Sequence, residues 1–277
     1  MSLMWKLSAT VLLLSSLACA QNSSDDVADF LEDQFSNNPR LKSVDVEVDS
    51  VVPVKEVKGW NAYIVDVKAV LKQKNKKSID QKMIWFSNGD VITKDLIDLK
   101  SGQNLVEVIK PQFKDIYYKA ENLIYGDKNA SHKIVIFSDP LCPFCKGFVP
   151  VALPELKKEP NKFAVYYYHL PLVRLHPASA TLVRAAVAAE LKGVKDVILR
   201  LYTVKVNPRE KDVNKILAAF NKVEGTNITI ADINSDAVKK QIKSDAAIAN
   251  DLMVRGTPTV YLDGKIDKTR KKYLKVK

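Results

Sequence analysis

The chain has 277 residues, 47% of them apolar, with 9 glycines and 12 prolines. This composition is typical of a packed globular protein and excludes a collagen-like or largely disordered chain. The formal net charge of +11 would suit a protein that binds nucleic acid or a membrane surface, and the three cysteines are too few for a disulfide-stapled scaffold.

Residues 1–20 have the pattern of a secretory signal peptide. Lys6 precedes the apolar run Leu7–Leu17, and small residues follow at the positions expected for cleavage before Gln21. The alternative is cleavage before Cys19, with a lipid anchor on that thiol. No later segment has about 18 uncharged apolar residues in a row, so we expect an exported and soluble mature protein.

Residues 21–101 are predicted to form a small α+β domain. Apolar residues at helical spacing predict a helix over 24–35, and alternating apolar residues predict strands at 44–48 and 63–71. Strand-like segments on both sides of Asn88-Gly89 predict a hairpin, because this dipeptide favours the tight turn between antiparallel strands. The pattern therefore predicts one helix and a small antiparallel sheet.

Residues 102–122 are predicted to form a linker helix between two domains. Its apolar stripe consists of Leu105, Val108, Ile109, Phe113, Ile116 and Tyr117. Because Pro111 falls inside this stripe, we expect a kink or a break near Lys110.

Residues 123–277 alternate strand-like and helix-like segments. The dense apolar run Lys133–Phe137 is typical of a central strand that is buried on both faces. The further predicted elements are a short strand at 122–125, a helix at 148–158, a strand at 163–169, four helical stretches within about 178–253, a hairpin at 259–266 and a basic helix at 268–276. This order is the layout of a thioredoxin fold with a helical insertion, so the whole chain is assigned to the α+β class.

The segment Cys142-Pro143-Phe144-Cys145 directly follows the predicted central strand and opens a helix. Two cysteines at this spacing lie in one helical turn and can contact each other. The first lies at the helix N-terminus, where unpaired N–H groups and the helix dipole favour the thiolate, which is the attacking species. Cys142 is therefore the expected nucleophile and Cys145 the resolving thiol, and Pro143 suits the first helical position.

Two structural interpretations of this pair stay open. A zinc site normally needs four ligands, but beyond this pair the chain after the predicted signal offers only His132, His169 and His176 as soft ligands. A purely structural disulfide would gain little from so short a loop. Neither alternative explains the pair as well as redox chemistry, so we expect no metal.

A second segment, Arg255-Gly256-Thr257-Pro258-Thr259, precedes the predicted strand of the C-terminal hairpin. With this segment and the run Phe137–Lys146 (FSDPLCPFCK), the chain resembles the thioredoxin superfamily and, within it, the periplasmic disulfide isomerases of the DsbC/DsbG type. The resemblance implies that Pro258 is cis and faces the dithiol. It also implies that Thr257 pairs through its backbone with an incoming extended peptide.

The resemblance also implies an architecture and partners. Residues 21–101 would be a cystatin-like dimerisation domain, and residues 123–277 the catalytic domain of a homodimer whose apolar cleft holds misfolded substrate. We expect a periplasmic disulfide isomerase that acts on unfolded or misoxidised exported proteins and is kept reduced by a DsbD-like membrane reductase. Its only redox group would be the Cys142–Cys145 disulfide itself, with no separate cofactor.

Three departures leave the direction of electron flow open. Many thioredoxin relatives have a buried acid six residues before the first cysteine, but Ile136 occupies that position. The dipeptide Pro143-Phe144 is close to the Pro-aromatic pair of DsbG, and the large helical block also resembles the monomeric oxidase DsbA. The alternatives are therefore a disulfide oxidase with a DsbB-like partner, or a chaperone-like dimer in which the thiols are incidental.

The positive charge is unevenly distributed. Residues 265–277 contain seven basic side chains and one acid, which is +6 of the total +11. The basic turn Lys72–Lys77 is interpreted as a solvated hairpin end. Because the charge gathers at one terminus of an exported protein, it does not indicate a nucleic-acid partner.

Overall fold

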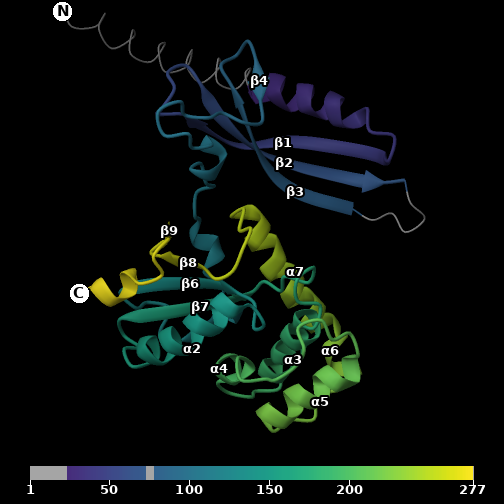
Figure 1. Cartoon of the computed structure of the whole chain (residues 1–277), viewed down its shortest axis with the longest axis vertical. Helices are drawn as coiled ribbons and strands as arrows, with labels where there is room; N and C mark the ends of the chain where they lie inside the picture. The colour runs from purple at the N-terminus through teal and green to yellow at the C-terminus, as the bar shows by residue number, and fades with distance from the viewer. Residues whose placement is uncertain (1–23, 73–77, 277) are drawn as a thin grey trace, which may run out of the picture. The chain divides into compact units, whose positions relative to one another are not determined.

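The computed structural model describes residues 24–72 and 78–276 and divides the chain into two compact units, residues 1–111 and 112–277 (Figure 1). The predicted signal peptide, including Cys19, lies outside the described residues. So does most of the predicted turn Lys72–Lys77. Within the described residues, no helix combines the length and apolar character needed to cross a membrane.

The N-terminal unit is a helix on a four-stranded antiparallel sheet. The helix is described from residue 24 to residue 36, and the strands follow in the order β1-β2-β3-β4. Their bounds are β1 Leu41–Pro53, β2 Asn61–Leu71, β3 Ser78–Ser87 and β4 Ile92–Thr93. Val27 and Leu31 of the helix pack against Tyr63 and Trp85 of the sheet. The hairpin at Asn88-Gly89 is confirmed, since β3 pairs with β4 across it.

A charged cluster lies within this sheet. Lys82 on β3 is 3% exposed, and its Nζ lies 2.9 Å from the Asp66 carboxylate on β2 and 3.3 Å from the Asp49 carboxylate on β1. Burial would lower the pKa of Lys82, but the hydrogen bonds and charges of the two carboxylates outweigh it and raise that pKa. Electrostatic contacts thus connect three strands.

The predicted linker helix over 102–122 is wrong. The segment contains only three single 3-10 turns, Leu105–Glu107, Asp115–Tyr117 and Ala120–Asn122, and the boundary between the units follows Pro111. Proline lacks the N–H that a helix needs and disfavours helical geometry at the residue before it. The apolar stripe also serves two cores, because Leu105 is buried in the first unit while Tyr117 packs against Phe113 in the second.

The C-terminal unit is built on a five-stranded sheet in the order β5-β7-β6-β8-β9. The strands are β5 Leu123–Tyr125, β6 His132–Ser138, β7 Phe163–His169, β8 Thr259–Leu262 and β9 Lys265–Ile266. Strands β6 and β7 are parallel, and the other neighbours are antiparallel. As its apolar run predicts, β6 is the central strand.

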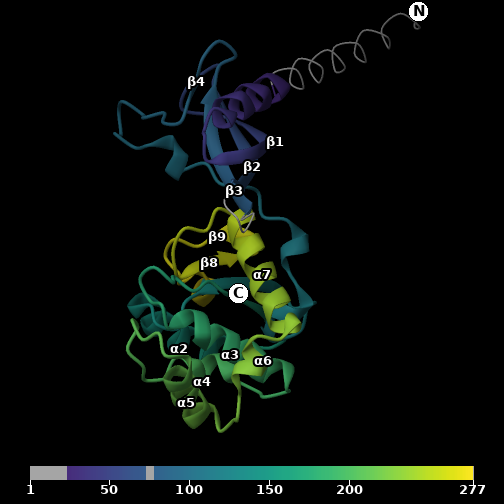
Figure 2. The ribbon, with the colours of Figure 1, turned by 90° about the vertical axis from the view of Figure 1, so that its right-hand side faces the viewer.

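Helices cover both faces of this sheet. Helix α2, Pro143–Lys157, packs on one face, and α7, Asp236–Asp251, packs on the other (Figures 1 and 2). The remaining helices are α3 Ser179–Leu191, α4 Val197–Leu201, α5 Val213–Glu224 and α6 Ile230–Ile233. Helices α3, α5 and α6 share a separate apolar core, which forms the inserted helical layer between β7 and β8.

The predicted basic helix over 268–276 is also wrong, because only a 3-10 turn, Lys272–Lys275, forms there. Asp267 accepts hydrogen bonds from the Thr269 hydroxyl at 2.6 Å and from the Lys272 backbone N–H at 2.8 Å. A side chain that takes up backbone donors in this way favours a turn over a continuing helix.

Candidate active site

The dithiol lies where the central strand β6 passes into helix α2. Cys142 is the N-cap residue of α2 and keeps an extended backbone, with φ −67° and ψ 125°. Pro143 takes the first helical position, where its missing N–H needs no partner. The Cys142 carbonyl accepts the Lys146 N–H at 3.0 Å, so the first helical turn places Cys145 beside Cys142.

The two thiols differ in exposure. Cys145 is fully buried in the core between α2 and the sheet, while Cys142 is 4% exposed at the rim beside Phe144, which is 72% exposed. An incoming disulfide therefore reaches Cys142 before Cys145. The roles of nucleophile and resolving thiol stay predictions.

The structure brings the second predicted segment against the first. The Cys142 thiol donates to the Thr257 carbonyl oxygen at 3.5 Å, although 115 positions separate the two residues. The Thr257–Pro258 peptide bond is cis. Strand β8 begins directly after Pro258 and pairs with β6, with Thr259 opposite Phe137, so sheet pairing holds this loop at the end of β6 where the dithiol begins.

A buried carboxylate supports the loop before the dithiol. Asp139 is fully buried and accepts hydrogen bonds from the Leu141 N–H at 2.8 Å and the Leu172 N–H at 2.7 Å. The Ser179 hydroxyl donates to it at 2.6 Å, and the His176 Nδ1 lies 3.0 Å away. Asp139 thus ties the dithiol loop to the start of α3. His176 is engaged in this contact, and sequence reasoning did not anticipate it.

Cys145 lies in an environment that opposes its ionisation. Burial raises the pKa of the Cys145 thiol to about 11, although the Ser138 and Thr257 hydroxyl groups partly offset the effect. Sequence reasoning did not anticipate a role for Ser138. The signal was present in its position, since it is the last residue of β6 and lies just before the loop that carries the dithiol.

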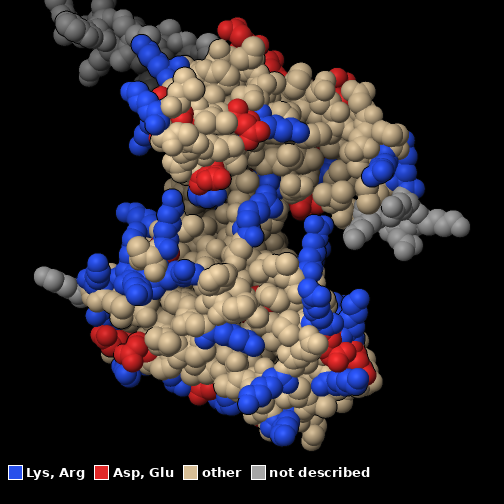
Figure 3. All heavy atoms as spheres, in the orientation of Figure 1, with Lys and Arg blue, Asp and Glu red and all other residues tan. Residues whose placement is uncertain are grey.

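A hollow of about 310 Å³ lies on the outer side of α2, next to the dithiol. Three of its apolar side chains are largely exposed: Phe144 at 72%, Val151 at 64% and Leu274 at 62%. Arg270 and Lys271 also line it. The drawn face of the C-terminal unit shows more basic than acidic side chains (Figure 3). Exposed apolar surface bordered by cations is suited to bind a peptide with apolar and acidic side chains.

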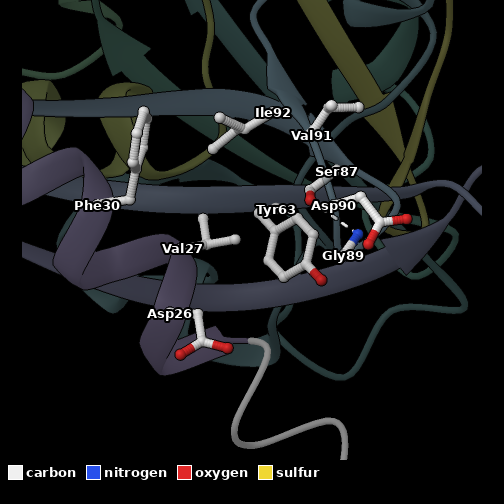
Figure 4. Close-up of a pocket in the computed structure, with 9 residues that line it drawn as sticks. All are labelled: Asp26, Val27, Phe30, Tyr63, Ser87, Gly89, Asp90, Val91 and Ile92. Atoms are coloured by element: carbon white, nitrogen blue, oxygen red, sulfur yellow. Dashed lines mark hydrogen bonds between the residues drawn. The ribbon is translucent and has the colours of Figure 1, made fainter.

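The N-terminal unit has a hollow of its own, of about 250 Å³, between its helix and the sheet. Figure 4 shows Val27 of the helix beside Tyr63 of β2 in this hollow, with the Gly89 N–H donating to the Ser87 hydroxyl at 3.0 Å. No thiol is among its lining residues, so it is separate from the dithiol site.

Comparisons with known proteins agree with this geometry. Residues 119–277 match the thioredoxin family, and the chain belongs to that family. It is 27% identical over 153 residues to the probable disulfide bond formation protein D of Bacillus cereus, covering 51% of this chain and 69% of that protein. The protein is therefore a thiol–disulfide oxidoreductase of the Dsb type.

Two solved structures are also similar. The thiol–disulfide exchange protein α-DsbA2 of Wolbachia pipientis is 22% identical, with a TM-score of 0.48 over 59% of this chain and 89% of that one. A putative protein-disulfide isomerase of Pseudomonas syringae is 17% identical, with a TM-score of 0.48 over 56% of this chain and 96% of that one.

Proposed function

We propose that this protein is a periplasmic disulfide isomerase that acts as a homodimer on misoxidised exported proteins. The observation that carries the proposal is the combination of a dithiol next to an exposed apolar hollow with a separate N-terminal unit that has its own core. Thiol exchange alone does not need that unit. Its long strand β1 lies at the edge of the described sheet, and edge strands are common sites of pairing between chains.

The proposed reaction begins with the Cys142 thiolate. It attacks one sulfur of a wrong substrate disulfide, forms a mixed disulfide and releases the other substrate sulfur as a thiolate. The substrate chain lies along the Thr257 backbone and places apolar side chains in the hollow beside Phe144. A second substrate thiolate then attacks the mixed disulfide and releases Cys142, so the exchange consumes no electrons.

Cys145 provides the escape route. If no substrate thiol attacks, the Cys145 sulfur attacks Cys142, the substrate leaves reduced, and the Cys142–Cys145 disulfide forms. The dithiol then needs two electrons, and we propose that a DsbD-like membrane reductase supplies them. No other cofactor takes part in this scheme.

A disulfide oxidase is the second candidate, and the relative from Bacillus cereus favours it because its name describes disulfide bond formation. In that case the Cys142–Cys145 disulfide accepts electrons from substrate thiols, and a DsbB-like partner reoxidises it. The two candidates differ in the resting state of the dithiol and in the substrate they rescue.

One experiment separates them. The purified chain from residue 21 onward is tested for its association state, its reduction potential and its ability to reactivate scrambled or fully reduced ribonuclease. We expect a dimer that, in its reduced form, reactivates scrambled ribonuclease. A monomer that rescues only reduced ribonuclease, in its oxidised form, would show that the oxidase assignment is right.

The control is Cys142→Ser, which we expect to abolish reactivation of both substrates. If this variant kept full activity, binding of unfolded chains would be the function and the thiols would be incidental.

A further inference from the structure

Behind the dithiol, three buried hydroxyl groups form a continuous chain. The Ser138 Oγ lies 2.6 Å from the Tyr202 Oη, which lies 2.7 Å from the Tyr167 Oη. Ser138 is fully buried, and Tyr167 and Tyr202 are 2% and 7% exposed. Three separate elements contribute them, namely β6, β7 and the end of α4.

This chain lies beside the expected resolving thiol. Tyr167 and Tyr202 belong to the same core as Cys145, between α2 and the sheet, and the Ser138 hydroxyl acts to lower the pKa of that thiol. Ser138 comes two residues after Ile136, whose fully buried side chain is also part of that core. Strand β6 therefore contributes the polar side chain of Ser138 to a core in which its other residues are apolar.

We propose that the hydroxyl chain Ser138–Tyr202–Tyr167 activates Cys145 by donating a relayed hydrogen bond to its sulfur. This inference rests on the proposed dithiol chemistry and assigns to Ser138 the hydrogen bond to the reacting sulfur, which makes it a catalytic residue. Tyr202 and Tyr167 act through Ser138 and are positioning residues.

The chemistry of hydroxyl groups makes the chain suited to this task. Each hydroxyl donates one hydrogen bond and can accept another, so all three can point toward Cys145 when it is a thiolate. Tyr167 then donates to Tyr202, Tyr202 to Ser138, and Ser138 to the sulfur. Successive bonds of this kind polarise and strengthen one another in a buried setting.

Among the described residues, no cation is one of the groups that most affect the pKa of Cys145. The titratable groups that face it are Cys142 and Asp139 beside it, Tyr167 on β7 and Tyr202 at the end of α4. Burial raises the pKa of Cys145 to about 11, and the Ser138 and Thr257 hydroxyl groups act against that rise. In the proposed relay, neutral donors perform the stabilisation that a buried charge would otherwise provide.

The step that this chain assists is balanced. Cys145 gives up its thiol proton and attacks the Cys142 sulfur of the mixed disulfide. The bond between Cys142 and the substrate breaks, and the substrate sulfur leaves with the electron pair and takes up a proton. The Cys142–Cys145 disulfide forms, and the substrate is reduced.

The test measures this step directly. A chromogenic aromatic disulfide first labels Cys142, and the concentration-independent release of the second chromophore then reports the attack by Cys145. We expect Ser138→Ala and Tyr202→Phe to slow that release about tenfold at neutral pH, because the loss of one hydrogen bond to a charged group raises a pKa by about one unit. Tyr167→Phe should have a smaller effect in the same direction.

The pH profile of the release distinguishes activation from a structural role. The variants should keep the rise of the rate with pH, but the whole profile should move to higher pH. Tyr168→Phe is the matched control, since Tyr168 lies on the same strand, is fully buried and donates to the Tyr117 carbonyl on the opposite face at 2.5 Å. It should leave the profile unchanged.

The outcomes are separable. If the profiles of Ser138→Ala, Tyr202→Phe and Tyr167→Phe coincide with the parent while their thermal midpoints fall, the chain is structural only and the inference is wrong. If Cys142 is not labelled in the parent protein, the proposed dithiol function fails instead. Should Tyr202→Phe not fold, Tyr167→Phe still decides, because it removes only the far hydroxyl.

Discussion

Burial divides the work between the two cysteines. Cys142 lies at the rim of the site, beside the exposed Phe144 and the Thr257 carbonyl, whereas Cys145 has no exposed surface. A substrate disulfide can therefore approach only Cys142. In the proposed reaction, Cys145 therefore attacks only a sulfur already bound to Cys142 and releases the trapped substrate.

Asp139 is the polar residue on which the position of the dithiol loop depends. In Asp139→Asn, an amide NH2 group would replace one of the two carboxylate oxygens that now accept hydrogen bonds. This NH2 group would then face hydrogen-bond donors instead of an acceptor. A buried donor without a partner costs about 1–3 kcal/mol, so Asp139→Asn should lower the free energy of unfolding by at least that amount. Urea denaturation, monitored by far-ultraviolet circular dichroism, measures this change in the free energy of unfolding.

The matched control for this prediction is Asp212→Asn at the N-cap of α5, where the side chain accepts from the Asn214 N–H at 2.9 Å. Asn caps helices about as well as Asp, so stability should not change. Equal stability of Asp139→Asn and the parent protein would show that the carboxylate is dispensable.

At the scale of elements, the charged cluster of the N-terminal sheet makes a second prediction. Lys82→Met removes the buried cation and leaves Asp49 and Asp66 facing each other without it. Loss of one partner of a buried ion pair typically costs about 3–5 kcal/mol. We therefore expect a loss of about 3 kcal/mol, measured by urea denaturation.

The pH dependence follows from the raised pKa of Lys82. A raised folded-state pKa means that this stabilisation is complete below the unfolded value near 10.5 and is lost as pH rises through the folded value. Lys68→Met is the control for the stability loss of Lys82→Met. The Lys68 ion pair with Glu47, 3.8 Å long, is exposed to solvent and is worth less than about 1 kcal/mol. Similar losses of stability in both variants would contradict the prediction.

Local pattern was sufficient for elements whose side chains all pack within one unit. The apolar run of β6 and the turn residues at Asn88-Gly89 lie where periodicity and turn chemistry place them. The segment 102–122 has an equally clear stripe, yet its side chains divide between the two units. Periodicity indicates that residues are buried but not which core they enter, so the helix was wrongly predicted.

The candidate site was likewise predictable only where short sequence motifs form it. Cys142 and Thr257 belong to short motifs that imply their own geometry, and the structure places them 3.5 Å apart, Sγ to carbonyl oxygen. Tyr202 and Tyr167 have no such motif. Tyr202 reaches Ser138, and Tyr167 reaches Tyr202, because β7 pairs with β6 and the end of α4 packs beside them. That packing is a property of the tertiary fold rather than of any local pattern.

At the scale of the whole molecule, the two units have separate cores and are joined by one chain segment near Pro111. The known family covers residues 119–277, which lie within the second unit. The first unit is thus the part whose contribution must be tested, and its removal separates thiol exchange from the handling of misfolded substrate.

A chain of residues 112–277 should keep the Cys142–Cys145 chemistry, because every contact of the dithiol described above lies within that unit. The rate at which it releases the chromophore from a small chromogenic disulfide should equal the rate of the longer chain. Reactivation of scrambled ribonuclease should fall, since isomerisation requires the substrate to stay bound through repeated exchanges and the truncated chain lacks the proposed dimerisation unit. If the truncated chain reactivates scrambled ribonuclease as fast as the chain from residue 21, the N-terminal unit has no part in isomerisation, and the dimeric cleft is not the binding surface.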